Sequence, residues 1–425
     1  MRLLVFNAGS SSLKFELIEL GEAPSRRVAA GSFAVTDGSG LLRWGSAAPG
    51  GSGASPGSGA TEAAQPPPAR TLAEAADYAL DWLSSTAVHG RDLLAGLDAT
   101  AHRIVHGGAH FRAATRLGDT ELVALAALGT LAPLHNPPAL AVIDAVRRRL
   151  RGDRPLIGVF DTAYYADLPE AAWRYAVPTP WLEELGVRRY GFHGIAHRYL
   201  CAEARARQRA FDGNSIRIIS LQLGRGCSVT ATLGARAVAT SMGFTPLEGL
   251  VMGTRCGDID PGALLYVLER TGMSVATMRR ALNEESGLLG LSGRSADMRE
   301  LLELERAGDP AAALAVECFC RRARHYVGGF LAELGGADVI VFGGGIGENC
   351  PEIRRRIVGS LEWAGVQLRP TPAATSSVAA RSAAGTSGES IHAPASRTAV
   401  YVVPVNEAAV IAADACAALQ RHAAR

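Results

Sequence analysis

Three glycine-containing turns are the residues of this sequence best suited to hold an anion. The first two, NAGSSS at 7–12 and LGRG at 223–226, each lie between two apolar runs, which predicts a β-hairpin. The third, FGGGIGEN at 342–349, follows an apolar strand pattern and precedes a helical one. Backbone N–H groups exposed in such turns bind phosphate. The turns therefore indicate a phosphate site, although none is a P-loop or a dinucleotide fingerprint.

The two hairpins also resemble each other. Asn7-x-Gly9 in the first aligns with Gln222-x-Gly224 in the second, and similar apolar runs flank both. Hairpins of this kind usually do no more than turn the chain. Two similar ones far apart in a sequence predict a duplicated fold with a ligand held between the halves.

Lys14 follows the first turn and is the only lysine among 43 basic residues. Lysine provides a compact, rotatable charge where arginine provides a planar fork. A charge of that kind is useful beside phosphates, but chance survival of one codon in an arginine-rich sequence also explains it.

Both strands and helices must position these turns. Strand patterns alternate with helical ones, which predicts an α/β fold. Asn406 is suited to cap the last helix. The expected strands are 3–8, 102–106, 156–160, 217–223, 228–233, 338–344 and 399–405, and the expected helices are 72–84, 137–150, 262–270, 309–334 and 406–420. Residues 45–69, rich in Gly, Ser, Ala and Pro, predict a flexible surface insertion, and 371–397 is a weaker example.

Composition limits the class of protein. A chain of 425 residues favours two domains, and a net charge of +2 gives no reason to expect nucleic acid or a membrane surface as a partner. No apolar run is long enough to cross a bilayer, and the N-terminus does not resemble a signal peptide. Seven scattered cysteines without a CxxC pair predict reduced thiols in the cytoplasm. His102, His106 and His110 are spaced like helical metal ligands, but their surroundings predict a strand and a turn.

Taken together, longer stretches of the sequence resemble the acetate kinase family, within the superfamily of actin-like ATPases and sugar kinases. They cover nearly the whole chain in order. The matching stretches are NAGSSSLKF (7–15), HRIVHGG (102–108), PLHNPP (133–138), FDTAYY (160–165), RRYGFHGIAHRYL (188–200), TSMGFTPLEGLVMGTRCGDIDPG (240–262), ESGLLGLSGRSADMRE (285–300), FGGGIGEN (342–349) and PVNEAAVIA (404–412).

The resemblance implies two duplicated actin-like, ribonuclease H-like domains with an active-site cleft between them. Domain I would be 1–162 completed by the C-terminal helix 409–425, and domain II would be 163–408. It also implies a homodimer that uses Mg²⁺, with Mn²⁺ as a substitute. The implied reaction is reversible transfer of the ATP γ-phosphoryl to the carboxyl group of acetate, which gives acetyl phosphate and ADP.

Roles for single residues follow from the same resemblance. Asp161, His193 and Arg255 match the catalytic residues, Arg103 matches a second active-site arginine, and Asn7 with Glu407 matches the Mg²⁺ site. His197 is expected to be an ordinary core histidine. The small pocket for the substrate methyl would be lined by Val105, Leu134, Phe192 and Pro246. The nucleotide would contact Lys14, Gln222, Leu223, Gly224, Arg225, Gly226, Asp297, Met298, Arg299, Gly345, Ile346, Gly347, Glu348 and Asn349.

The second hairpin departs from the family pattern. The family usually has HLGNG where this chain has QLGRG, with Gln222 and Arg225 at the altered positions. Three interpretations stay open: an ATP-dependent acetate kinase with a variant turn, an acetate kinase with another donor such as pyrophosphate or a different nucleotide, and an inactive actin-like nucleotide-binding protein. Retention of the acceptor-side residues favours an enzyme, and retention of GGGIGEN favours a nucleotide.

Overall fold

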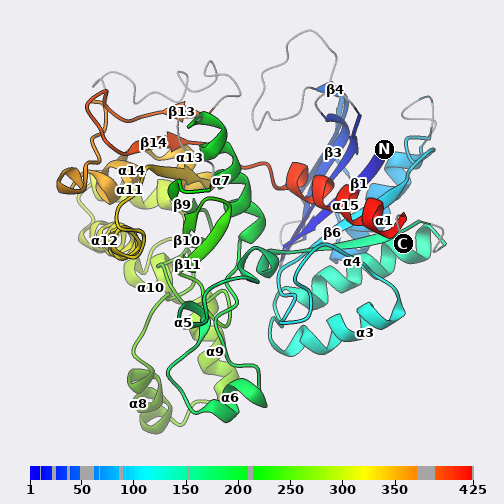
Figure 1. Cartoon of the computed structure of the whole chain (residues 1–425). Helices are drawn as coiled ribbons and strands as arrows, with labels where there is room; N and C mark the ends of the chain where they lie inside the picture. Colours follow the sequence, from blue (N-terminus) through cyan, green and yellow to red (C-terminus); the bar gives the residue numbers. More distant parts are fainter. Residues whose placement is uncertain are drawn as a thin grey trace. The chain divides into compact units, whose positions relative to one another are not determined.

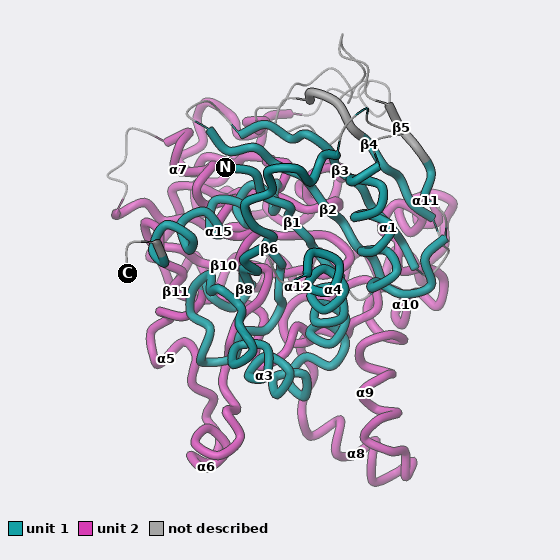
Figure 2. Tube along the Cα trace, turned by 90° about the vertical axis from the view of Figure 1, so that its right-hand side faces the viewer, with its two compact units in different colours: residues 1–164, 381–386, 406–425 teal, residues 165–380, 387–405 magenta. Residues whose placement is uncertain are grey.

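The computed structural model describes residues 1–9, 11–21, 25–35, 39–47, 62–66, 68–85, 90, 92–151, 154–208, 214–370 and 388–423. Within these ranges the chain divides into two compact units (Figures 1 and 2). Unit 1 contains the described residues of 1–164 and 406–423, and unit 2 contains those of 165–370 and 388–405.

Unit 1 is built on an eight-stranded sheet in the order β5-β4-β3-β2-β1-β6-β8-β7. The central strand β1 is buried on both faces, since Leu3, Leu4, Val5 and Phe6 are at most 1% exposed. The strands are β1 (Arg2–Ala8), β2 (Ser12–Glu19), β3 (Arg26–Ala34), β4 (Gly40–Ala47), β5 (Glu62–Ala64), β6 (Ala99–Ile104), β7 (Thr115–Arg116) and β8 (Leu156–Phe160).

Helices cover this sheet. The helices α1 and α4 pack against each other and against the sheet, while α15 packs along β1, β6, β7 and β8. Asn406 caps α15 as predicted, because the backbone N–H of Ala409 donates to its Oδ1 at 3.1 Å. The helical segments are α1 (Leu72–Ser84), α3 (Asp119–Ala127), η1 (Leu128–Thr130), α4 (Asn136–Arg149), η2 (Asp161–Tyr165) and α15 (Glu407–Ala423).

Unit 2 has a six-stranded sheet in the order β11-β10-β9-β12-β14-β13. The long helix α12 packs on β9 and β10, and α7 packs on β9 and β12. Its strands are β9 (Arg217–Leu223), β10 (Cys227–Leu233), β11 (Arg236–Thr240), β12 (Val339–Gly343), β13 (Glu389–Ser390) and β14 (Ala399–Val402). Its helices are α5 (Glu170–Trp173), α6 (Thr179–Glu183), α7 (Gly194–Arg207), α8 (Pro261–Thr271), α9 (Val275–Glu284), α10 (Gly287–Ser292), α11 (Met298–Arg306), α12 (Pro310–Leu334), α13 (Gly344–Asn349), α14 (Pro351–Val358) and η3 (Glu362–Ala364).

The two sheets repeat one topology, which confirms the predicted duplication. In unit 1, β1 pairs antiparallel with β2 and parallel with β6, which pairs parallel with β8. In unit 2, β9 pairs antiparallel with β10 and parallel with β12, which pairs parallel with β14. Each unit therefore has a hairpin whose first strand begins a parallel set, and Asn7 and Gln222 lie near the ends of those two first strands.

Every strand and helix expected from the sequence is present, some with the expected ends and the others with ends shifted by a few residues. His102 lies on β6, so the three spaced histidines do not share a helix face. All seven cysteines lie within the described ranges, and none of them forms a disulfide. No helix within the described ranges is both long and apolar enough to span a bilayer.

The segment 45–69, predicted as a flexible surface insertion, includes parts of two strands. Residues 45–47 continue β4, and Glu62–Ala64 form β5, which pairs with β4 through Trp44 and Glu62. Ala69 is only 4% exposed. Small residues that lack a core of their own can still extend the edge of an existing sheet, which composition alone does not reveal. Residues 48–61 and 67 of that segment, and 371–387 of the second one, lie outside the described residues.

Candidate active site

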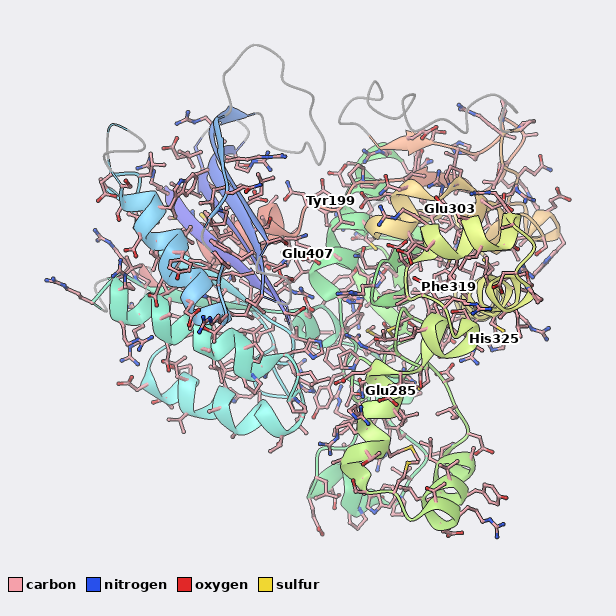
Figure 3. All side chains as sticks on the ribbon, turned by 180° about the vertical axis from the view of Figure 1, so that it is seen from behind. Tyr199, Glu285, Glu303, Phe319, His325 and Glu407 are labelled. Carbon is pink, nitrogen blue, oxygen red and sulfur yellow. The ribbon has the colours of Figure 1, made fainter. Side chains whose placement is uncertain are left out.

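Unit 1 gathers Asn7, Arg103, Asp161 and Glu407 into one hydrogen-bonded cluster. Arg103 on β6 donates from Nη2 to Asp161 Oδ2 at 2.7 Å and from Nε to Asp161 Oδ1 at 3.2 Å. It also donates from Nη1 to Asn7 Oδ1 at 3.0 Å. Asn7 Nδ2 in turn donates to Glu407 Oε2 at 2.5 Å. Glu407 lies in the first turn of α15 and is labelled in Figure 3.

Strand ends and one helix start explain why these residues meet. Asp161 follows β8 directly, Arg103 is the next-to-last residue of the adjacent parallel strand β6, and Asn7 is the next-to-last residue of β1. Carboxyl ends of neighbouring parallel strands lie at one edge of a sheet, where α/β proteins place their ligands.

The cluster is largely buried and carries more negative than positive groups. The Asp161 side chain is fully buried, and those of Arg103 and Glu407 are 14% and 18% exposed. Burial acts to lower the pKa of Arg103, but the negative charges of Asp161 and Glu407 outweigh burial and raise that pKa. Arg103 therefore stays charged, and two carboxylates face its single positive charge.

This donor set fits Mg²⁺. Magnesium binds proteins through one or two hard carboxylate oxygens and keeps several waters or phosphate oxygens. Glu407 supplies a partly exposed carboxylate, and Asn7 is fixed beside it at 2.5 Å. The oxygen of Asn7 accepts from Arg103, so Glu407 is the stronger candidate for a direct ligand and Asn7 for orienting it.

The other predicted residues of unit 1 have different exposures. Lys14 is exposed and pairs directly opposite Asn7 in the β1–β2 hairpin, which places both side chains on one face of the sheet. Val105 is buried and Leu134 is 39% exposed. A buried asparagine ties their two segments together, because Asn136 accepts from the N–H of His106 at 3.1 Å and donates to its carbonyl at 2.9 Å.

In unit 2 the turn of the second hairpin faces His193 and Arg255. A Cβ placed on Gly226 would lie 3.3 Å from His193 Nε2 and 3.4 Å from Arg255 Nη1, so glycine is needed for this close approach. Gly224 N–H donates to the carbonyl of Gly226, and the carbonyl of Arg225 accepts from Gly253. Within the described ranges the N–H groups of Arg225 and Gly226 donate to no protein acceptor, so they are available to an anion.

Arg255 differs from Arg103 because no carboxylate of the described residues pairs with it. Its Nη1 donates to the carbonyl of Pro246 at 3.2 Å. Burial lowers the pKa of Arg255, and the nearby Cys227 opposes this weakly. A guanidinium that has lost water without gaining a counter-ion favours an anionic ligand.

His193 occupies a constrained backbone conformation at the start of α7. It has a φ of 57°, in the left-handed region that residues other than glycine seldom adopt. Its Nδ1 lies 2.9 Å from the hydroxyl of Ser228. The ring is thereby fixed with Nε2 toward the Gly226 turn. Phe192 and Pro246, the other two predicted pocket residues, are buried in this unit.

The third glycine cluster, at 342–349, lies next to the same turn. A Cβ on Gly224 would lie 3.9 Å from the backbone nitrogen of Gly345, the second residue of α13. Gln222 packs against Gly344, and its Oε1 is buried with no donor among the described residues. Gln222, one of the two altered positions of this hairpin, therefore lies against the start of α13.

Several residues expected to contact nucleotide serve the fold. Glu348 Oε1 accepts from the N–H of Gly344 at 3.0 Å and of Val405 at 3.1 Å, so its carboxylate holds the start of α13 and the chain before α15. Leu223, Met298 and Gly347 are buried, which leaves only their backbone available to a ligand. Gly345 and Asn349 are exposed.

The loop at 296–299 lies beside the turn. A Cβ on Gly253 would lie 3.3 Å from the carbonyl of Ala296 and 3.5 Å from that of Arg225. Asp297 caps α11 by accepting from the N–H of Arg299 at 2.8 Å, and it pairs with the exposed Arg299 guanidinium. This surface residue pair can turn toward a ligand with little loss of stability.

Two serines that the sequence did not single out, together with the histidine expected in the core, complete the site. Ser228, Ser220 and His197 form a buried hydrogen-bonded chain behind His193. Burial lowers the pKa of His197 to about 3, so it is a neutral histidine. Its position one helical turn after His193 was the only signal in the sequence, and that spacing also suits a core residue.

Comparison with known proteins shows similarity along nearly the whole chain. A model of the acetokinase family matches residues 2–413. The acetate kinase of Solibacter usitatus (strain Ellin6076) is 40% identical over 424 residues, which is 97% of each chain. The crystal structure of Porphyromonas gingivalis acetate kinase matches with a TM-score of 0.80 at 33% identity, over 98% of this chain and 99% of that one. A propionate kinase structure from Francisella tularensis subsp. tularensis SCHU S4 matches with a TM-score of 0.80 at 31% identity, over 97% and 98%.

Proposed function

Because the chain belongs to the acetokinase family, we propose that it is an acetate kinase that transfers the γ-phosphoryl of ATP to acetate, reversibly. The main observation in support of this proposal is the contrast between the surroundings of Arg103 and Arg255. Arg103 is held by a buried carboxylate, and Arg255 is a partly buried cation that pairs with no carboxylate of the described residues. Phosphoryl transfer needs little covalent help from a protein, but it needs positioning and positive charge on the transferred group.

The acceptor requires no general base. Acetate is already a nucleophile, and its approach to a polyanion is opposed by charge until cations intervene. Asp161 is fully buried with both oxygens bonded to Arg103, so it orients that guanidinium and does not accept a proton. Arg103 is then ready to hold a carboxylate by its forked N–H groups. Mg²⁺, held by Glu407 beside Asn7, would neutralise phosphate charge when it is bound.

The donor is held by the turns of unit 2. The free N–H groups of Arg225 and Gly226 suit phosphate oxygens. His193 Nε2 and Arg255 face the same turn, so both can stabilise the phosphoryl group as charge redistributes over its oxygens. This role is proposed for His193 and Arg255 because both face the same turn and both match the family motif.

The Arg225 side chain is exposed, and only its backbone is tied to the turn. The departure from the family pattern at this position therefore changes a surface side chain and leaves the turn itself intact. This supports ATP as donor over pyrophosphate, and the retained α13 turn beside Gly224 supports it further.

Acetate is the proposed acceptor, with propionate a slower one. Val105, Leu134, Phe192 and Pro246 are the apolar residues proposed to contact the substrate methyl. One added methylene changes transition-state binding by only about 1–3 kcal/mol, so discrimination should be modest.

We also propose that the protein works as a homodimer in the cytoplasm. Seven cysteines without a disulfide among them support a reducing compartment. In unit 2, α8 has no buried residue, and its Leu265 and Tyr266 are 61% and 62% exposed. A helix this apolar and this exposed supports a partner subunit on that surface.

Acyl-hydroxamate formation from acetate tests the proposal, with ATP, GTP and pyrophosphate as donors in parallel. Product is expected with ATP and Mg²⁺, and EDTA should abolish it. Faster product formation with pyrophosphate would show that the donor is wrong. Nucleotide binding with every donor inactive would favour the alternative of an inactive actin-like protein.

A further inference from the structure

A chain of four hydrogen-bonded side chains leads from His193 into the core of unit 2. Nδ1 of His193 lies 2.9 Å from Oγ of Ser228, and Nε2 of His197 lies 2.7 Å from that same oxygen. Nδ1 of His197 lies 2.8 Å from Oγ of Ser220. Ser220, Ser228 and His197 are all 0% exposed. These three residues are called the relay below.

The hydroxyl of Ser228 couples the two histidines. It carries one proton, so between two ring nitrogens it donates to one and accepts from the other. His197 is neutral, because burial lowers its pKa to about 3, and it therefore carries one ring proton. If His193 is also neutral, two arrangements of these hydrogen bonds are possible. In the first, each group donates toward His193, and in the second, each group donates toward Ser220.

The far end of the relay distinguishes the two arrangements. If the protons point toward Ser220, its own hydroxyl has to donate to the Thr230 carbonyl at 3.5 Å. That is longer than the usual O–H···O range of roughly 2.5–3.0 Å. If they point toward His193, Ser220 donates to His197 at 2.8 Å, and its oxygen can accept from the Cys201 thiol at 3.7 Å. Buried polar chains favour the arrangement in which every group is satisfied.

We infer that the relay holds neutral His193 in the tautomer that carries its proton on Nε2. This inference rests on the proposed function, in which His193 donates a hydrogen bond to the transferred phosphoryl group. Nε2 is the nitrogen that faces the Gly226 turn, 3.3 Å from the position of a Cβ there. A ring with its proton on Nδ1 would present a lone pair to an anion, so the tautomer decides whether the neutral ring can assist. Ser228, His197 and Ser220 are positioning residues that act through His193.

The tautomer can be measured without activity. In protein labelled with ¹⁵N-histidine at about pH 8, above the ordinary histidine pKa of about 6.5, ¹H–¹⁵N correlations report which ring nitrogen carries the proton. The His193 signal, assigned by its loss in His193→Gln, is expected to show a protonated Nε2. In Ser228→Ala we expect both tautomers. A proton on Nδ1 in the native protein, or an unchanged signal in Ser228→Ala, would overturn the inference.

Kinetics provide an independent test. Ser228→Ala should lower kcat about tenfold, below the ~10²–10⁴ that a positioned proton-transfer group can contribute, with little change in KM. The matched control is Thr230→Val, which removes a buried hydroxyl from the same strand. The Thr230 hydroxyl bonds Tyr165 and Thr240 and lies outside the relay. The kcat per folded molecule should therefore be unchanged.

A double-mutant cycle separates this inference from the proposed function. If the relay acts through His193, then Ser228→Ala should add no further loss in the His193→Ala background. An additive loss would contradict the relay. If His193→Ala keeps full activity, the proposed role of His193 is wrong, whatever the tautomer.

Discussion

Arg255 and Arg103 differ in what their removal would leave behind. Arg255→Met removes a desolvated cation that has no carboxylate partner among the described residues, so the protein should be as stable as before or more stable. Its kcat should fall by about 10²–10³, the scale for one preorganised donor to transition-state charge. Urea unfolding and kcat, measured on the same preparations, test both parts.

Arg103→Met is the matched comparison. It leaves Asp161 buried at 0% exposure without its guanidinium, which should cost roughly 3–5 kcal/mol of unfolding free energy. Equal destabilisation by the two substitutions would contradict the assignment of Arg255 as an unpaired cation.

At this scale the sequence named candidate residues through a family resemblance, but it did not predict how they interact. Asn7, Arg103, Asp161 and Glu407 come from distant segments, and the structure brings all four together. The relay could not be predicted, because it depends on strand register. Ser228 pairs opposite Gln222, and that register brings its hydroxyl within reach of both histidine rings.

Among the elements, α13 depends on a carboxylate that its motif suggested was for nucleotide. Glu348→Ala should release the N–H groups of Gly344 and Val405 and cost about 1–3 kcal/mol, the penalty for unsatisfied buried groups. Asn349→Ala, at the exposed end of the same helix, should leave stability unchanged and raise the KM for ATP. Thermal unfolding with and without ATP separates the two effects. A stable Glu348→Ala protein would show that the carboxylate is not structural.

Because β5 pairs with β4 at the edge of the unit 1 sheet, we expect two deletions in this region to differ in their effect on the melting temperature. Replacing 48–61 with a short Gly/Ser link keeps the paired strands β4 and β5, so the melting temperature should hold, since loop length has a small effect on stability. Replacing all of 45–69 removes β5 and the end of β4, and should lower it by several degrees. Equal melting temperatures would mean that β5 contributes nothing.

Element types were predictable because periodicity reports burial. The five-residue strands β8 and β12 are buried along their whole length, and α1 was predicted with its observed ends, Leu72–Ser84. Strand β5 was not predictable. Its pairing with β4 depends on an existing sheet edge, and a segment of Glu and Ala carries no β signal of its own.

For the whole molecule, the surface of α8 is the proposed place of self-association. Leu265→Arg adds a charge to an apolar helix surface that is 61% exposed in the single chain, so it should convert a dimer to a monomer. Val123→Arg, at a valine of α3 in unit 1 that is 72% exposed, is the control. Size-exclusion chromatography with light scattering measures both. A monomeric wild-type protein, or an unaffected dimer in Leu265→Arg, would contradict this assignment.

The central claim is that the γ-phosphoryl of ATP moves to the carboxylate of acetate. Following the purified protein with ATP, Mg²⁺ and acetate by ³¹P NMR observes donor and product in one experiment. We predict that an acetyl phosphate signal grows together with ADP in equal amounts, and that Arg255→Met slows both signals alike. Release of inorganic phosphate with ADP in the absence of acetyl phosphate, or no loss of ATP at all, would contradict the claim.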